Sequence, residues 1–97
     1  MSYLVTYKNV LRPHKNKSDY LQWLQHYWTV QRRWGATSYD LWSTEENNRR
    51  ILFCRYTVSD LDKWTASAAN PSCDRLVEDL SQIVDVNRMS IKITNNN

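Results

Sequence analysis

The chain has 97 residues, of which 41% are hydrophobic and 24% are charged, so it can form one folded domain and no more. Its net charge of +3 and the absence of any basic run longer than two residues argue against a nucleic-acid-binding surface. No apolar run approaches the roughly 20 residues of a membrane-spanning helix, so we expect no membrane partner.

Five tryptophans and six tyrosines against a single phenylalanine are the unusual feature of the composition. Both side chains combine a large apolar area with a polar tip, which suits interfaces and partly wet pockets. The only cysteines, Cys54 and Cys73, lie in an apolar strand pattern and a helical pattern. Without a signal peptide before them, they are expected to be reduced thiols in a cytoplasmic protein.

The first third of the chain predicts a strand, a loop and a long helix. Residues 2–10 are rich in β-formers, and the segment LRPHKNK that follows is typical of a loop. Ser18 is the expected N-cap of the helix, with Asp19 favourable beside its positive end. Gly35, the only glycine, is expected to end the helix as a left-handed C′ residue, because it lacks the Cβ that would clash there.

The middle of the chain predicts a hairpin. The segment TSYDLWST (37–44) is a second strand, EENN (45–48) is a turn, and RRILFCRYTV (49–58) is a third, central strand. In this interpretation, Tyr39 and Leu41 share one face with Ile51 and Phe53, whereas Trp42 lies on the other.

The last third predicts a broken helix and a fourth strand. Ser59 is the expected N-cap of the helix, Asn70-Pro71 interrupts it, and Ser72 caps a further stretch. The segment VDVNRMSIKIT (84–94) has an alternating strand pattern with Met89, Ile91 and Ile93 on one face, and residues 94–97 are expected to be a loose tail.

The predicted order is β-α-β-β-α-β, which indicates a single ferredoxin-like α+β domain over residues 1–97, with both helices on one face of a four-stranded antiparallel sheet. The other face of strands one to three also carries large apolar side chains, so it should be buried by a partner. The simplest partner is a second copy under two-fold symmetry, which predicts a homodimer.

This order resembles the dimeric α+β barrel proteins, as do the aromatic first helix ending in RRWGATSYDLW and the second helix opening with SDLDKW. The resemblance covers roughly residues 2–93, and the chain resembles the small proteins of this superfamily that are related to antibiotic-biosynthesis monooxygenases. It implies two sheets packed into a barrel across a dimer, and a pocket between the helices and the sheet of each subunit. It supports the fold far more than any activity.

Two polar residues are predicted to point into the folded protein. Gln31 lies about 20° from the centre of the apolar arc of the first helix, between Tyr27 and Trp34. It is either a core glutamine bonded to the backbone or a tyrosine hydroxyl, or a pocket residue that orients a ligand. Arg55 on the third strand is either paired with Asp40 or an anchor for an anion.

The histidines do not match a metal-binding pattern, because His14 lies in a loop and His26 at the rim of the first helix's apolar stripe. His26 is either a surface or interface residue, or a general base or haem ligand. We expect no metal site and no cofactor.

The resemblance also implies candidate site residues. In the haem-degrading members a strand-one Asn, a second-helix Trp and a second-helix His carry the site; Asn9 and Trp64 match the first two, but residues 66–76 contain no histidine. That departure puts haem degradation in doubt. The cofactorless oxygenases of the superfamily use Asn, Trp and Tyr around a flat aromatic substrate that supplies its own carbanion. Asn9, Trp64, Trp34 and Tyr27 could form such a set, with Gln31 beside it.

Three functions follow as hypotheses. The first is a small homodimeric enzyme, monooxygenase-like and cofactor-independent, or a protein that binds a flat, mostly apolar, aromatic or polyketide-like compound. The second is a non-catalytic module for self-association or protein interaction. The third, RNA binding, is disfavoured because RRILFCRYTV lacks the glycines and aromatic spacing of the RNA-recognition signature.

Overall fold

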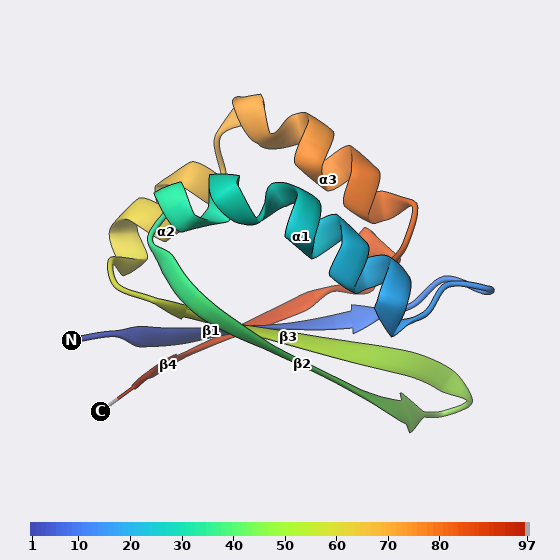
Figure 1. Ribbon diagram of the computed structural model, residues 1–97. Coiled ribbons are helices and arrows are strands. Elements are labelled where there is room, and N and C mark those ends of the chain that lie inside the picture. Colours follow the sequence, from blue (N-terminus) through green and yellow to red (C-terminus); the bar gives the residue numbers. More distant parts are fainter. Residues whose placement is uncertain (97) are drawn as a thin grey trace.

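The computed structural model describes residues 1–96 and has three helices packed on one face of a four-stranded antiparallel sheet (Figure 1). The strands are β1 (Tyr3–Val10), β2 (Ala36–Glu46), β3 (Arg49–Val58) and β4 (Ser90–Asn95), in the spatial order β2-β3-β1-β4. The helices are α1 (Lys17–Arg33), α2 (Leu61–Ala68) and α3 (Asp74–Ser81), with 3-10 turns η1 (Pro71–Cys73) and η2 (Val86–Arg88). The predicted ferredoxin-like α+β fold is confirmed.

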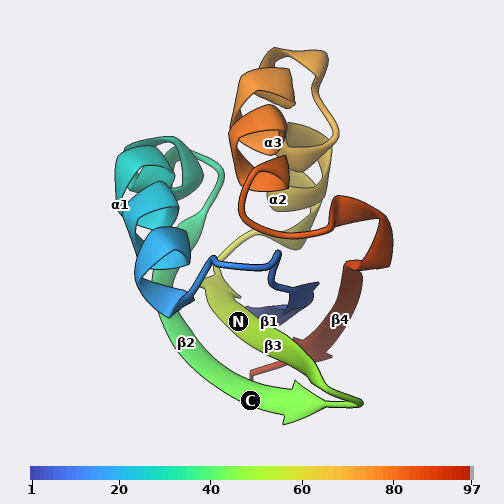
Figure 2. The same ribbon diagram turned by 90° about the vertical axis from the view of Figure 1, so that its right-hand side faces the viewer.

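The helices form one layer, with α1 on one side and α2 and α3 on the other, above a strongly curved sheet (Figure 2). The buried core lies between the two layers and includes Tyr20, Leu24, Leu52, Tyr56 and Val84. No helix within residues 1–96 is both long enough and apolar enough to cross a membrane.

Each predicted N-cap differs from the observed one by one or two residues. Asn16, not Ser18, caps α1: its Oδ1 accepts from the Asp19 N–H at 3.1 Å, and Asp19 Oδ2 accepts from the Asn16 N–H at 2.9 Å. This reciprocal pair needs an acidic residue three positions after the cap, which Ser18 does not have. Asp60, not Ser59, caps α2, and the Ser59 hydroxyl instead donates to the Gly35 carbonyl at 3.2 Å.

The break in the second helical region is confirmed at Asn70-Pro71, but Ser72 does not cap the next stretch. The Asn70 side chain accepts from the Ser72 N–H at 2.9 Å, and Pro71 occupies the first turn of η1, where a missing N–H does no harm. Gly35 behaves as predicted: it follows the C-cap of α1 with φ +107°, in the left-handed region.

Strand pairing corrects the predicted faces of the hairpin. Trp42 pairs with Phe53 and Leu41 pairs with Cys54, so Leu41 faces the helices whereas Phe53 lies on the uncovered face. The two-residue turn Asn47-Asn48, with φ of +53° and +64°, pairs odd-numbered with even-numbered residues, so Leu41 and Phe53 cannot share a face.

The uncovered face is therefore mixed in character, with apolar and charged side chains interspersed. Its apolar members are Leu4, Val10, Trp42, Ile51 and Phe53. Its charged members include Lys8, Asp40, Arg55 and Lys92.

The fourth strand is shorter at its start than predicted. Residue Val84 makes only an isolated bridge to Leu11, and the Asp85 side chain accepts from the Asn87 N–H at 3.1 Å, which favours the turn η2 over a strand. The strand then continues to Asn95, past the predicted start of the tail at residue 94. Residue 97 of that predicted tail lies outside the described residues.

Candidate functional site

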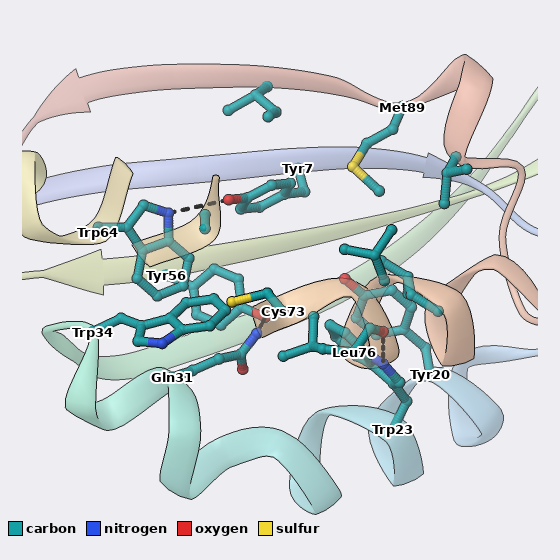
Figure 3. A pocket seen from close by; sticks show the side chains of 15 residues that line it. Tyr7, Tyr20, Trp23, Gln31, Trp34, Tyr56, Trp64, Cys73, Leu76 and Met89 are labelled. Atoms are coloured by element: carbon teal, nitrogen blue, oxygen red, sulfur yellow. Dashed lines mark hydrogen bonds between the residues drawn. The ribbon is translucent and has the colours of Figure 1, made fainter. Parts of the chain in front are cut away.

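A cavity of about 290 Å³ lies between the helix layer and the sheet (Figure 3). This volume is at the lower end of the range for small-molecule pockets. Six of its fifteen lining side chains are aromatic, and none of the fifteen is charged. They are Tyr7, Tyr20, Trp23, Gln31, Trp34, Tyr56, Trp64, Ala68, Cys73, Leu76, Val77, Leu80, Val86, Met89 and Ile91.

The cavity is deep on one side and open on the other. Tyr56 and Trp64 are buried, whereas Val77 on α3 and Ile91 on β4 are 43% and 55% exposed. Ile91 lies across from Tyr7 on the helix side of the sheet, but the helices stop short of this edge strand. The mouth of the cavity therefore lies between α3 and β4.

The aromatic rings of the deep end support one another. The Trp64 ring lies 5.5 Å from the ring of Trp34 and 4.8 Å from that of Tyr56, and the Tyr7 and Tyr56 rings meet edge to face at 5.7 Å. Tilted and edge-to-face contacts of this kind stabilise aromatic clusters beyond their buried area. The cluster holds flat apolar surfaces in fixed orientations around the cavity.

Two hydrogen bonds join side chains that line the cavity. Trp64 Nε1 donates to the Tyr7 hydroxyl at 3.1 Å, and Gln31 Nε2 donates to the Tyr56 hydroxyl at 2.9 Å (Figure 3). Gln31 is only 3% exposed, and its Oε1 has no hydrogen-bond partner within residues 1–96. Turning the amide over would only exchange an unpaired oxygen for an unpaired NH₂ group.

The phenol groups of the cavity are neutral donors at pH 7. Burial raises the pKa of Tyr7, against a smaller lowering by the Trp64 hydrogen bond. Burial also raises the pKa values of Tyr20 and Tyr56 well above the ordinary value. Each hydroxyl therefore keeps its proton and can donate it in a hydrogen bond to a ligand oxygen.

The structure brings three of the predicted site residues, Gln31, Trp34 and Trp64, to this one cavity. Asn9 lies beneath it, fully buried on β1. Its Nδ2 donates to the Tyr20 hydroxyl at 3.4 Å and to the Leu52 carbonyl at 3.2 Å. Asn9 therefore contacts a lining residue without lining the cavity itself.

The other three predicted ligand-binding residues lie elsewhere. Tyr27 donates from its hydroxyl to Asp79, and the exposed His26 packs edge to face on it at 4.7 Å, in a separate depression between α1 and α3. Arg55 lies on the uncovered face of the sheet, where its Nη2 bonds Asp40 Oδ2 at 3.1 Å. The predicted pairing of Arg55 with Asp40 is confirmed.

Comparison with known proteins shows the fold alone. No protein-family model and no curated protein sequence matches the chain. Among solved structures, the cofactor-independent oxygenase SnoaB from Streptomyces nogalater superposes with a TM-score of 0.69 at 9% identity, covering 99% of this chain and 93% of that one. A putative antibiotic biosynthesis monooxygenase from Nitrosomonas europaea gives 0.69 at 8% identity, covering 98% and 89%. A conserved protein from Methanosarcina mazei Go1 gives 0.70 at 17% identity, covering 100% and 94%.

The chain has the ferredoxin-like α+β fold of these three structures. At sequence identities of 8–17%, the similarity lies in the backbone and not in the site residues. The chemistry of the cavity therefore depends on this chain's own side chains. Among residues 1–96, no group of three or more His, Cys, Asp or Glu side chains is placed to hold a metal ion.

Several residues that line the cavity were not predicted as site residues from the sequence. Tyr7 and Tyr56 come from paired central strands, and Cys73, Leu76 and Met89 come from the irregular region around α3. The alternation that puts Tyr7 on one face with Val5 was the available signal. The contact between Tyr7 and Trp64 depends on how α2 crosses the sheet, which sequence periodicity does not predict.

Proposed function

We propose that the protein binds a flat, mostly apolar compound that carries a hydrogen-bond donor, in the cavity between its helices and its sheet. The observation that carries this proposal is the unpaired Gln31 Oε1 among six aromatic rings. Leaving a buried acceptor without a partner costs on the order of 1–3 kcal/mol. A ligand hydroxyl that donates to this oxygen removes that cost, and the rings cover the ligand's flat faces.

The uncharged lining of the cavity restricts the charge that the buried part of a ligand can carry. Because no charged side chain of the described chain lines the cavity, an ionised carboxylate there would lack a counterion, and its desolvation would be unfavourable. Phenolic and quinone-like compounds match better, since the hydroxyls of Tyr7 and Tyr56 are oriented by Trp64 and Gln31. We therefore expect hydroxylated aromatic or polyketide-like compounds rather than aromatic acids.

A second candidate function is cofactor-independent oxygenation of that same compound, which the fold shared with SnoaB favours. A phenol with an adjacent methylene can ionise to a carbanion that reacts with dioxygen; the methylene becomes a carbonyl, and the second oxygen atom leaves as water. The neutral hydroxyls of Tyr7 and Tyr56 would stabilise the negative charge on the substrate oxygen. Dioxygen consumption with a hydroxyanthrone as substrate tests this step.

The binding proposal predicts that Gln31→Met selectively weakens binding of a hydroxylated ligand. Trp23, Trp34 and Trp64 line the cavity, so quenching of tryptophan fluorescence by 2-hydroxyanthraquinone, whose hydroxyl has no neighbouring carbonyl to bond, reports binding. We expect Gln31→Met to raise the Kd about tenfold, which corresponds to about 1.4 kcal/mol for one hydrogen bond. Binding of unsubstituted anthraquinone should change far less.

The matched control is Gln25→Met, on the exposed side of the same helix. It should leave both affinities unchanged. Equal Kd values for the parent, Gln31→Met and Gln25→Met would show that the Gln31 amide does not recognise the ligand. Absence of quenching by every compound would favour the non-catalytic interaction module instead.

We also propose that the protein is a cytoplasmic homodimer closed over the uncovered sheet face. On that face Trp42 is 38% exposed and stacks on Phe53 at 5.2 Å with an interplanar angle of 11°, and the Arg55 guanidinium lies 5.4 Å from the Trp42 ring. Aromatic and arginine side chains gathered in this way are typical of the centres of protein interfaces.

Phe53→Glu is expected to dissociate the dimer, because it removes the ring that stacks on Trp42 and places a charge that must lose its water at the centre of the interface. Size-exclusion chromatography with light scattering should show the dimer dissociation constant rising by at least about 100-fold, or about 2.7 kcal/mol. Thr29→Glu, on the exposed side of α1, is the control and should leave the dimer intact. A parent protein that is monomeric at high concentration contradicts the proposal.

A further inference from the structure

A further hollow, of about 440 Å³, lies at the end of the molecule where β1 ends and β3 begins. Four arginines from three separate segments line it: Arg12 after β1, Arg49 and Arg50 at the start of β3, and Arg88 in η2. Figure 1 shows these segments together at the right-hand end of the molecule. None of its lining residues lines the aromatic cavity.

Backbone hydrogen bonds fix the frame that carries these arginines. The Leu11 N–H donates to the Arg50 carbonyl, the Arg12 N–H to the Ile83 carbonyl, and the Asp85 N–H to the Val10 carbonyl, each at 2.9 Å. The end of β1 is thereby bonded both to β3 and to the segment before η2. Charged groups on a rigid backbone frame are better placed for binding than groups on free loops.

The residues that line the hollow carry an excess of positive charge. Its four arginines and the single acidic residue Asp85 give a local charge of +3, equal to the net charge of the whole chain. The rest of the sequence therefore carries as many positive as negative charges. Glu46, across the strands from Arg49, is instead paired with Lys8 at 2.8 Å.

Most guanidinium donors in the hollow are free. Arg88 pairs with Asp85 at 3.2 Å, Arg50 donates to the Arg12 carbonyl at 3.1 Å, and Arg12 donates to the Ser81 carbonyl. Within residues 1–96, the Arg49 guanidinium has no side-chain hydrogen bond or ion pair. Each guanidinium has five N–H donors, so these bonds orient the arginines and leave most donors available to a ligand.

We propose that this arginine hollow binds the phosphate group of a small soluble phosphate monoester. A phosphate monoester is close to a dianion at neutral pH and offers three acceptor oxygens, so it can engage several guanidinium forks at once. A carboxylate has one charge and matches a single fork. The charge of +3 and the convergence of arginines from three segments therefore favour phosphate.

The test is isothermal titration calorimetry with phenyl phosphate, inorganic phosphate and benzoate on the parent protein and two double variants. We expect Arg49→Gln with Arg88→Gln to weaken phenyl phosphate binding at least about tenfold. Arg32→Gln with Arg33→Gln, which removes the same charge at the end of α1, should stay within about twofold. The single variant Arg49→Gln, whose side chain makes no bond to lose, should weaken binding without changing the melting temperature.

Three results would overturn the proposal. The first is an equal loss of phenyl phosphate affinity in both double variants, which would indicate a general charge effect. The second is benzoate binding as tightly as phenyl phosphate, and the third is no binding of any soluble phosphate. To separate a lipid headgroup from a free monoester, vesicles of phosphatidylcholine with and without phosphatidic acid are compared. Binding to phosphatidic acid vesicles alone, without phenyl phosphate binding, also overturns it. Failure here leaves the aromatic cavity untouched, since the two sites share no residue.

Discussion

Replacing Ala68 with phenylalanine is expected to abolish binding of any compound in the aromatic cavity. Ala68 lies on α2 one turn after Trp64, so both side chains point to the same side of the helix and into the cavity. A phenyl ring there occupies part of a space of only about 290 Å³ without removing any hydrogen bond. Titration with 2-hydroxyanthraquinone should show a Kd at least about 100-fold higher, or about 2.7 kcal/mol.

Ala66→Phe provides the matched control, because Ala66 is exposed on the opposite side of the same helix. It adds the same ring and should leave the affinity unchanged. If Ala68→Phe kept the parent affinity while its ring was seen inside the cavity, the compound would have to bind elsewhere. The fluorescence signal itself should survive in both variants, since all five tryptophans remain.

Trp64→Ala should be among the most destabilising single substitutions in the chain. Trp64 is 3% exposed, packs against Trp34 and Tyr56, and donates to the Tyr7 hydroxyl. Removing a buried indole costs about 3–5 kcal/mol, a large share of the 5–15 kcal/mol that stabilises a typical domain. Thermal unfolding should show the melting temperature falling by more than about 12 °C.

Two companion variants separate the contributions of Trp64. Trp64→Phe keeps an aromatic ring but loses the bond to Tyr7, so it should cost less than Trp64→Ala. Trp28→Ala removes a half-buried indole that contacts Tyr39 outside the cavity, and we expect at most half the loss of Trp64→Ala. Equal losses for Trp28→Ala and Trp64→Ala would mean that the aromatic cluster does not hold the helices on the sheet.

Local chemistry was sufficient to predict the order of the elements. Gly35 marked the end of the first helix because the left-handed backbone region excludes most other residues, and Pro71 marked the break before α3. The caps were less certain, because Asn16, Ser18, Ser59 and Asp60 are all favourable cap residues. The choice among them depends on contacts elsewhere, such as the Ser59 bond to Gly35.

Helical periodicity also identified the most informative polar residue of the site. It placed Gln31 on the buried side of α1, and the structure has it buried and bonded to Tyr56. Periodicity cannot show which strand residues face it, because that depends on sheet register and on the crossing of α1 over β3. The same limit explains why Tyr27, on the same helix, was placed in the candidate site although it bonds Asp79 outside it.

Strand register was the structural feature that the sequence predicted least well. The hairpin faces depend on whether the turn has an even or an odd number of residues, because an odd number exchanges the two faces of one strand. In the observed two-residue turn, both Asn47 and Asn48 adopt positive φ. Asparagine accepts this conformation more readily than most residues, but the segment EENN alone does not show where the turn begins. As a result, Tyr39 and Leu41 were assigned to one face with Ile51 and Phe53, whereas Trp42 is the side chain that lies beside Phe53 on the uncovered face.

The presence of a single glycine has a consequence for the unfolded chain. An average sequence of this length would contain about seven glycines, each of which loses roughly 0.5–1 kcal/mol more than alanine in backbone conformational entropy on folding. With Gly35 as the only glycine, the unfolded ensemble is smaller, and the conformational-entropy cost of folding is about 3–6 kcal/mol lower. This difference is comparable to the cost of the two buried amide oxygens, of Asn9 and Gln31, that lack a partner within residues 1–96, so a chain of 97 residues can fold with unpaired polar atoms at its cavity.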